Sequence, residues 1–210
     1  DLLDIACDPQ LVRLAKENSG LPVCVSSIEP KLFPAAVAAG AELVEIGNFD
    51  SFYAEGRTFS ASEVLSLAEE TRNLLPKIVL SVTVPHMLPL DQQASLALDL
   101  VAVGADLIQT EGGTSAKPFS PGTLGLIEKA SPTLAAAYSI SEALSAAETS
   151  VPVLCASGLS AVTLPMAIAA GASGVGVGSA VNRLNDEVAM VASILLLRGS
   201  LSRRRSILAE

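Results

Sequence analysis

Short apolar runs alternate along the chain with longer segments in which apolar residues recur at helical spacing. The short runs have the length and the Val, Leu and Ile content of buried strands, whereas the longer segments are typical of amphipathic helices. The predicted helices include Pro9–Asn18, Ser62–Leu75, Asp91–Val103 and Thr163–Ala170. The predicted strands are Leu2–Cys7, Pro22–Ser27, Leu43–Asn48, Ile78–Val84, Leu107–Glu111, Leu134–Tyr138, Val151–Ser157 and Gly174–Ala180.

A Gly-Ala pair recurs directly before apolar runs, at Gly40, Gly104 and Gly171. A glycine that ends a helix just before a strand is what repeated strand–helix units require. The pattern predicts an α/β fold, a (β/α)8 TIM barrel that forms a single domain over residues 1–210. An open doubly wound sheet is the alternative, but no Gly-x-Gly-x-x-Gly follows the first strand. Because the chain begins at Asp1 and enters a strand at once, we expect N-terminal residues to be lacking.

Alternation within the strands predicts which side chains face the barrel lumen. In the fourth strand Ile78, Leu80, Val82 and Val84 suit the helix side, which leaves Ser81 and Thr83 inward. The same alternation sends further polar residues into the lumen, namely Asp4, Glu45, Gln109, Glu111 and Ser157. Buried carboxylates must be paired, protonated, metal-bound or catalytic. A structural polar layer of Asp4, Gln109, Ser81 and Thr83 is the alternative reading.

None of the lysines lies within a predicted strand, which disfavours Schiff-base chemistry near the barrel axis. The lumen carboxylates favour either Mg²⁺ binding or general acid–base catalysis by Glu45 and Glu111. His86, the single histidine, follows the fourth strand at the end where such barrels react, so it is either a proton shuttle or a polar loop residue. Cys155 is either a nucleophile or, as its apolar surroundings favour, part of the core.

The loops after the last two predicted strands suggest a phosphate site, because barrels commonly bind phosphate there. Glycines in these loops let backbone approach a ligand closely, and the N–H groups that open a helix after Gly178 favour an anion. The candidate residues are Ser157, Gly158, Ser160, Gly178, Ser179 and Ala180. Alternatively, the glycines serve only the packing of strands against helices.

Two other loops are candidates for the pocket wall. The segment Gly47–Tyr53, which includes Asn48, concentrates aromatic residues in a chain with 3 % aromatics, and it would floor a pocket, form a lid or pack as a simple loop. Gly112 and Gly113 precede Thr114 and Ser115 and would either bind a second anion or form a turn.

Composition excludes several classes of function. The net charge is −9 and the basic cluster Arg203–Arg205 is confined to the end of the chain, so we expect neither nucleic acid nor a membrane surface as a partner. Half of the residues are hydrophobic, and the three cysteines lie in apolar runs, as expected for reduced core thiols. The predicted partner is therefore a phosphorylated small molecule. The oligomeric state and the identity of any metal stay open.

Several stretches resemble the hypothetical chloroplast reading frame twenty-three proteins of cyanobacteria and algal plastids. They are Asp4-Ile-Ala-Cys-Asp8, Cys24-Val-Ser-Ser-Ile-Glu-Pro30, Val44-Glu-Ile-Gly-Asn-Phe-Asp-Ser-Phe-Tyr53, Leu80-Ser-Val-Thr-Val-Pro-His86, Ile108-Gln-Thr-Glu-Gly-Gly-Thr114, Cys155-Ala-Ser-Gly-Leu-Ser160 and Gly174-Val-Gly-Val-Gly-Ser-Ala180. The resemblance implies a barrel of the phosphate-binding type, located in the cyanobacterial cytoplasm or the chloroplast stroma. It implies no catalytic residues, because the family has no assigned activity. Its members begin with a further strand and helix, which would make one predicted strand surplus, the Ala-rich run Leu134–Tyr138.

Three functions are compatible with these observations. The first is an isomerase, epimerase or lyase that acts on a small phosphorylated metabolite by carboxylate acid–base chemistry, with Mg²⁺ or His86 polarising a carbonyl. The second is a barrel that binds flavin mononucleotide (FMN) through the same phosphate loops. The third is a non-catalytic protein that senses a metabolite or binds a partner.

Overall fold

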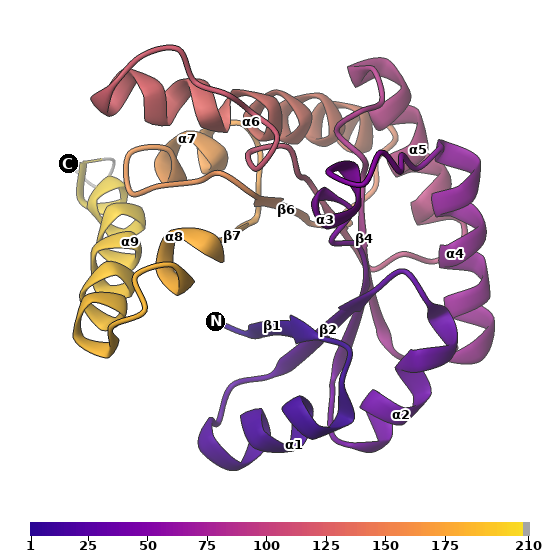
Figure 1. Ribbon diagram of the computed structural model, residues 1–210. Helices are drawn as coiled ribbons and strands as arrows, with labels where there is room; N and C mark the ends of the chain where they lie inside the picture. Colours follow the sequence, from indigo (N-terminus) through magenta and orange to yellow (C-terminus); the bar gives the residue numbers. More distant parts are fainter. Residues whose placement is uncertain (208–210) are drawn as a thin grey trace.

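Seven parallel strands form one curled sheet at the centre of the molecule, in the order β1-β2-β3-β4-β5-β6-β7 (Figure 1). The computed structural model describes residues 1–207, and side chains as far as residue 202. Each strand pairs with its neighbour in sequence, as expected when a helix connects each strand to the next. The strands are β1 Leu3–Ala6, β2 Val23–Ser27, β3 Leu43–Ile46, β4 Val79–Thr83, β5 Leu107–Gln109, β6 Val153–Ala156 and β7 Gly174–Gly176.

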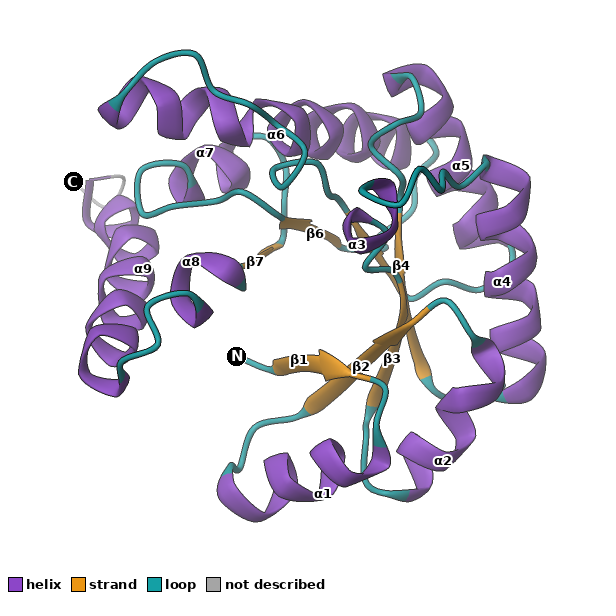
Figure 2. Ribbon diagram, in the orientation of Figure 1, coloured by secondary structure: helices purple, strands orange, loops and turns teal. Residues whose placement is uncertain are grey.

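The longer helices surround this sheet, and the short helices α3 and α8 lie nearer its centre (Figure 2). Helix α1 starts with a local cap, because the Asp8 carboxylate accepts a hydrogen bond from the backbone N–H of Gln10. The helices are α1 Pro9–Asn18, the 3-10 helix η1 Pro30–Leu32, α2 Phe33–Ala38, α3 Asp50–Tyr53, α4 Ala61–Leu74, α5 Leu90–Ala102, α6 Gly122–Ala146, α7 Leu164–Ala169, α8 Ser179–Asn182 and α9 Glu187–Ile207. Helix α9 includes Arg203–Arg205, whose side chains lie outside the described ones.

The barrel-type architecture is confirmed, but the predicted strand Leu134–Tyr138 is wrong. These residues belong to α6, whose buried positions include Thr133, Ala136, Ala137 and Ile140. That spacing is helical, and Ala and Leu are strong helix formers. The described chain thus has seven strands where the apolar runs predicted eight. The strands predicted as the seventh and eighth are β6 and β7, so the loops of the predicted phosphate site follow these two strands.

Alternation in the strands sorts apolar from polar side chains as predicted. Val44, Ile46, Leu80 and Val82 are fully buried in the hydrophobic core. Glu45 lies between two of these residues and points to the opposite face. The register pairs Ser26 with Glu45 and Glu45 with Ser81, and one layer higher it pairs Thr83 with Gln109. The polar layer inside the barrel is therefore a direct result of strand register.

Candidate functional site

The deepest part of the site is a hydrogen-bonded carboxyl group, that of Glu45. Its Oε1 accepts hydrogen bonds from Thr83 Oγ1 at 2.6 Å and from Gln109 Nε2 at 2.6 Å. The Ser26 hydroxyl oxygen lies 2.7 Å from Glu45 Oε2 and 2.7 Å from Asp4 Oδ1. A hydroxyl group has a single proton to donate. One of the two carboxyl groups must therefore carry a proton to satisfy both short contacts.

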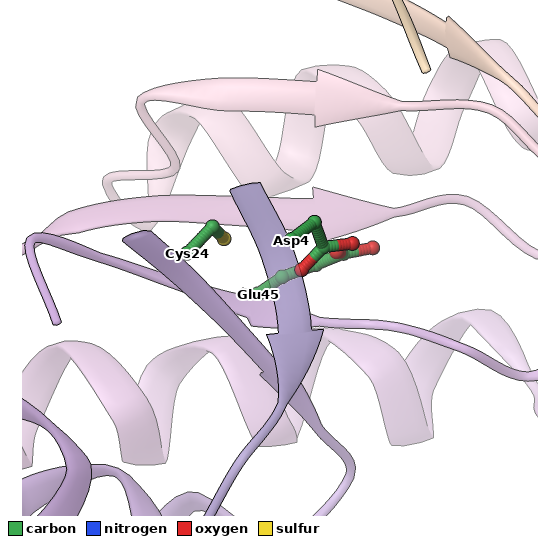
Figure 3. A group of neighbouring side chains, drawn as sticks. All are labelled: Asp4, Cys24 and Glu45. Carbon is green, nitrogen blue, oxygen red and sulfur yellow. The ribbon is translucent and has the colours of Figure 1, made fainter. Parts of the chain in front are cut away.

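The environment of Glu45 supports this protonation. Burial raises its pKa to about 8, and the charge of Asp4 adds to the increase. The pKa of Asp4 is also raised, chiefly because neighbouring protein atoms partly desolvate its carboxyl group, although Asp4 lies on the edge strand β1 and is still exposed. Figure 3 shows the two carboxyl groups side by side, with the Cys24 side chain to one side of them. Burial also raises the pKa of the Cys24 thiol, which is therefore neutral.

A second network surrounds Glu111, which follows β5 and is 5 % exposed. Its Oε1 accepts hydrogen bonds from the Tyr53 hydroxyl, from the backbone N–H of His86 at 3.1 Å and from His86 Nδ1 at 3.0 Å. Burial opposes a charge on His86, but the hydrogen bond with Glu111 and the charges of Glu111 and Asp50 together raise its pKa. The pKa of Tyr53 is raised by burial and by Glu111, which keeps its hydroxyl protonated.

Asp50, the first residue of α3, joins this network to the loops after β5 and β6. Its Oδ2 accepts a hydrogen bond from Ser157 Oγ at 3.1 Å, and its Oδ1 accepts one from Ser115 Oγ at 3.2 Å. The backbone N–H of Thr114 donates to Ser157 Oγ at 3.2 Å. His86 Nδ1 lies 3.9 Å from Asp50 Oδ1. The carboxylate thus holds three separate segments together.

Two groups of side chains have the geometry to bind a metal ion. In each of Asp4–Cys24–Glu45 and Asp50–His86–Glu111, the ligand atoms lie within 4.8 Å of one another. Both oxygens of Glu45 already take part in hydrogen bonds, so a metal in the first group would have to displace these bonds. The second group combines carboxylate oxygens with an imidazole nitrogen, a set that suits Mn²⁺ or Zn²⁺ better than Mg²⁺.

The two networks meet at one cavity of about 550 Å³. Its wall combines carboxyl groups with hydroxyl groups, loop backbone and two cationic side chains, Lys129 and Arg183. The residues that line it include Asp4, Asn48, Asp50, Thr83, Gln109, Glu111, Thr114, Lys129, Ser157, Gly158, Ser160, Gly178, Ser179, Ala180 and Arg183. Among the described residues, most of the predicted site residues therefore come together around one space.

Several predicted site residues are not part of the cavity wall. Glu45 lies beneath it and contacts Thr83 and Gln109, which do line it, whereas His86 stands behind Glu111. The Ser81 hydroxyl is buried and has no hydrogen-bond partner among the described residues. Gly112 and Gly113 pack against neighbouring chain segments. Cys155 is fully buried and its thiol donates to the Thr133 carbonyl at 3.6 Å, which favours the core reading.

The glycines of the site have two different environments. A Cβ on Gly113 would lie 2.2 Å from Gly158 Cα, and a Cβ on Gly158 would lie 2.5 Å from Gly113 Cα. Both glycines are therefore needed for the close contact of the loops after β5 and β6. A Cβ on Gly178 would meet no protein atom within 4 Å. Packing thus explains Gly113 and Gly158, whereas Gly178 leaves open space at the cavity.

Lys129 and Arg183 were not predicted. The lysines were predicted only to lie outside the strands, and the wrong strand at Leu134–Tyr138 concealed the long helix that contains Lys129. In fact Lys129 belongs to α6, which begins on the cavity side and whose backbone packs near Gly158. Arg183 follows directly after α8, five residues beyond Gly178. Because α8 has only four residues, its dipole is small, and Lys129 and Arg183 are cationic residues that line the cavity.

Comparisons with known proteins identify relatives without an assigned activity. A protein-family model described as "Protein of unknown function (DUF561)" matches residues 1–207. The chain is 47 % identical over 190 residues to the "Uncharacterized protein ycf23" of Cyanophora paradoxa, which covers 90 % of this chain and 76 % of the relative. It is 37 % identical over 205 residues to the protein of the same name from Porphyra purpurea, which covers 98 % of this chain and 76 % of the relative.

Solved structures of similar shape are barrel-type enzymes. One is titled "QR15, an Aldolase", with a TM-score of 0.59, 23 % identity and coverage of 83 % of this chain and 76 % of that chain. A 2,3-dimethylmalate lyase of the PEP mutase/isocitrate lyase superfamily has a TM-score of 0.56 and 14 % identity, and it covers 80 % of this chain and 63 % of that one. These low identities establish the fold alone.

Proposed function

The chain belongs to the DUF561 family, and from its site we propose that it binds a small phosphorylated carbonyl compound and moves a proton next to the carbonyl. The reaction would be that of an isomerase, an epimerase or a lyase. One observation carries the proposal: a single cavity is lined by the carboxyl groups of Asp4, Asp50 and Glu111 together with Lys129 and Arg183. The structural neighbours described as an aldolase and a lyase are compatible with it.

Glu111 is the group that would take the proton from the substrate carbon. It lines the cavity, and Oε1 is held by Tyr53 and His86 in a fixed orientation. Such orientation of a base by neighbouring donors is a common feature of acid–base catalysis, because it reduces the entropy lost on reaching the reactive geometry.

The carboxyl pair of Asp4 and Glu45 would supply the complementary acid. Asp4 and Glu45 share one proton through the Ser26 hydroxyl group. Asp4 itself lines the cavity, as do Thr83 and Gln109, which contact Glu45. A reaction that removes one proton from the substrate and adds another needs an ionised base and a protonated acid in the same site. Epimerisation or enolisation needs both partners, since one group removes a proton and another returns it.

The phosphate would lie at the other end of the cavity. Lys129 and Arg183 provide positive charge, and Ser157, Ser160 and the backbone around Gly178 provide hydrogen-bond donors. Holding the phosphate there would fix the carbonyl part of a short substrate against Glu111. Binding energy from a remote group is then used to position the reacting atoms.

The test is proton exchange with solvent. The purified protein is incubated in D₂O with a panel of short phosphorylated ketoses and phosphorylated 2-keto acids, and ¹H NMR follows the loss of C–H signals. We expect exchange with at least one compound, and at least a hundredfold loss of its rate in Glu111→Gln. Glu69→Gln makes the same change on an exposed face of α4 and serves as the control. Equal exchange in Glu111→Gln and in the unaltered protein would refute the assignment of the base.

Other outcomes of the same preparation identify the alternatives. Visible flavin absorbance that remains with the purified protein would favour FMN binding. A phosphorylated ligand that binds without exchange, with equal affinity for Glu111→Gln, would favour a metabolite sensor.

We further propose that the protein acts in the cyanobacterial cytoplasm or the plastid stroma, as its ycf23 relatives suggest. Within residues 1–207, none of the helices combines the length and apolar character that a membrane crossing requires.

A further inference from the structure

The loop after β6, which belongs to the proposed phosphate site, already binds an anionic group of the protein itself. Ser157 Oγ donates to Asp50 Oδ2 at 3.1 Å, and Ser115 Oγ donates to Asp50 Oδ1 at 3.2 Å. Both Asp50 and Ser157 line the cavity. The Asp50 carboxylate thus occupies the Ser157 hydroxyl group, which would otherwise be free to donate a hydrogen bond to a phosphate oxygen.

Asp50 has little compensation for its own charge. Its side chain is 14 % exposed, and its nearest cationic partner among the described residues is His86, with 3.9 Å between Nδ1 and Oδ1. Glu111 competes for the same nitrogen at the shorter distance of 3.0 Å. A phosphate group beside Ser157 would repel the carboxylate, because two anions cannot share one donor at close range without a large Coulomb cost.

We propose that Asp50 is an internal competitor for the phosphate site, so that a phosphate group binds by displacing this carboxylate from Ser157. The proposal rests on the proposed function and adds a control step to it. Without ligand, Asp50 holds α3 against the loops after β5 and β6; with ligand, this attachment is released.

Displacement of Asp50 from Ser157 would affect the hydrogen bonds of Glu111, because α3 connects the two residues. This helix has only four residues, and its last residue, Tyr53, donates its hydroxyl proton to Glu111. A shift at Asp50 therefore changes the contact of Tyr53 three residues later. Occupation of the phosphate site is in this way coupled to the carboxylate that would act as the base.

The chain offers an intrinsic reporter of this coupling. It has no tryptophan and two tyrosines, Tyr53 and Tyr138. Tyr138 is 58 % exposed on α6, so Tyr138→Phe leaves Tyr53 as the single tyrosine and preserves the fold. Tyrosine emission is quenched by a hydrogen bond to a carboxylate, so loosening of the Tyr53–Glu111 contact raises it.

The experiment titrates inorganic phosphate into Tyr138→Phe protein, with tyrosine emission and isothermal titration calorimetry as two readouts. We expect emission to rise with the same Kd that calorimetry gives. Asp50→Asn removes the charge but keeps the size, and we expect it to bind phosphate about tenfold more tightly. Ser115→Ala removes one anchor of Asp50 outside the phosphate loop, and it should tighten binding by a smaller factor. Asp99→Asn, an exposed position on α5, is the matched control with unchanged affinity.

Two results would overturn the proposal, and they differ from each other. If phosphate binds equally or more weakly to Asp50→Asn, while its thermal unfolding matches that of the unaltered protein, Asp50 is not a competitor and the proposed function stands. If no variant binds phosphate, the phosphate site fails, and the internal competitor fails with it.

Discussion

Glu45→Gln should remove a pH dependence of stability that originates inside the barrel. Protonated Glu45 accepts hydrogen bonds from Thr83 and Gln109 at Oε1 and can donate a proton to Ser26 from Oε2. A glutamine amide reproduces this pattern, because its oxygen accepts twice and its NH₂ group donates. The substitution therefore mimics the protonated carboxyl group at every pH.

The magnitude follows from the pKa of Glu45, which burial and Asp4 raise from 4.5 to about 8. A group whose pKa is higher in the folded state binds its proton more tightly there, so its contribution is complete below about pH 4.5 and is lost as the pH rises to about 8. Each pH unit in this window costs up to about 1.4 kcal/mol, and the whole window has a ceiling of about 5 kcal/mol. Above pH 8 the carboxylate is ionised and buried, whereas glutamine stays neutral.

Urea unfolding of both proteins between pH 5 and pH 9 measures this difference. We expect similar free energies of unfolding near pH 5, and a growing advantage of Glu45→Gln as the pH rises, levelling off above about pH 8. Asp4→Asn should reduce the pH dependence as well, because it removes the charge that raises the pKa of Glu45. Parallel pH profiles for the unaltered protein and Glu45→Gln would refute the reasoning, since Glu45 would then be ionised throughout.

Other variants test the glycines and the charged groups of the cavity. Gly158→Ala should destabilise the fold by about 2–3 kcal/mol in urea unfolding, because residue 158 has φ +72° and its Cβ would meet Gly113. Gly178→Ala should leave the unfolding free energy within about 0.5 kcal/mol and weaken phosphate binding in calorimetry, since its Cβ would enter open space at the cavity; unchanged affinity would contradict a ligand there. In NMR titrations the pKa of His86 in the folded protein should lie above 6.5. The stability that protonated His86 contributes is therefore complete below pH 6.5 and is lost as the pH rises through the pKa of the folded state. Glu111→Gln should lower this pKa, because it removes a negative charge and a hydrogen-bond partner of His86. Arg183→Gln and Lys129→Gln should each weaken phosphate binding about tenfold without changing the melting temperature, and a shifted melting temperature would indicate a structural role instead.

The lumen could be predicted from sequence because strand alternation is a local property. Once Val44 and Ile46 are assigned to the core, Glu45 has to point to the opposite face, and register then brings it to Ser26 and Ser81. The same reasoning placed Asp4, Thr83 and Gln109 correctly, since each lies in a strand. Their convergence around one carboxyl group needed no information beyond the alternation and the parallel order of the strands.

The cationic residues of the site and the contact between Asp50 and Ser157 could not be predicted in this way. The run Leu134–Tyr138 is short, apolar and rich in Ala, and only its helical burial spacing distinguishes it from a strand. That one ambiguity concealed α6, the helix that contributes Lys129 to the cavity wall. Asp50 reaches Ser157 across 107 positions of sequence, through a short helix whose orientation depends on the packing of Phe52 and Tyr53 against Phe59. No periodic pattern encodes such a contact.

The contact between Gly113 and Gly158 limits how this barrel can acquire new ligands. Because a side chain at either position would push two loops apart, neither loop can be redesigned independently of the other. Libraries that randomise the loops after β5 and β6 together would consist mostly of misfolded members. Diversity is better introduced in α3 and around α8, which border the same cavity through Asp50 and Ser179 and lie outside the glycine contact. A change of ligand in this scaffold is therefore expected to begin in its two shortest α-helices.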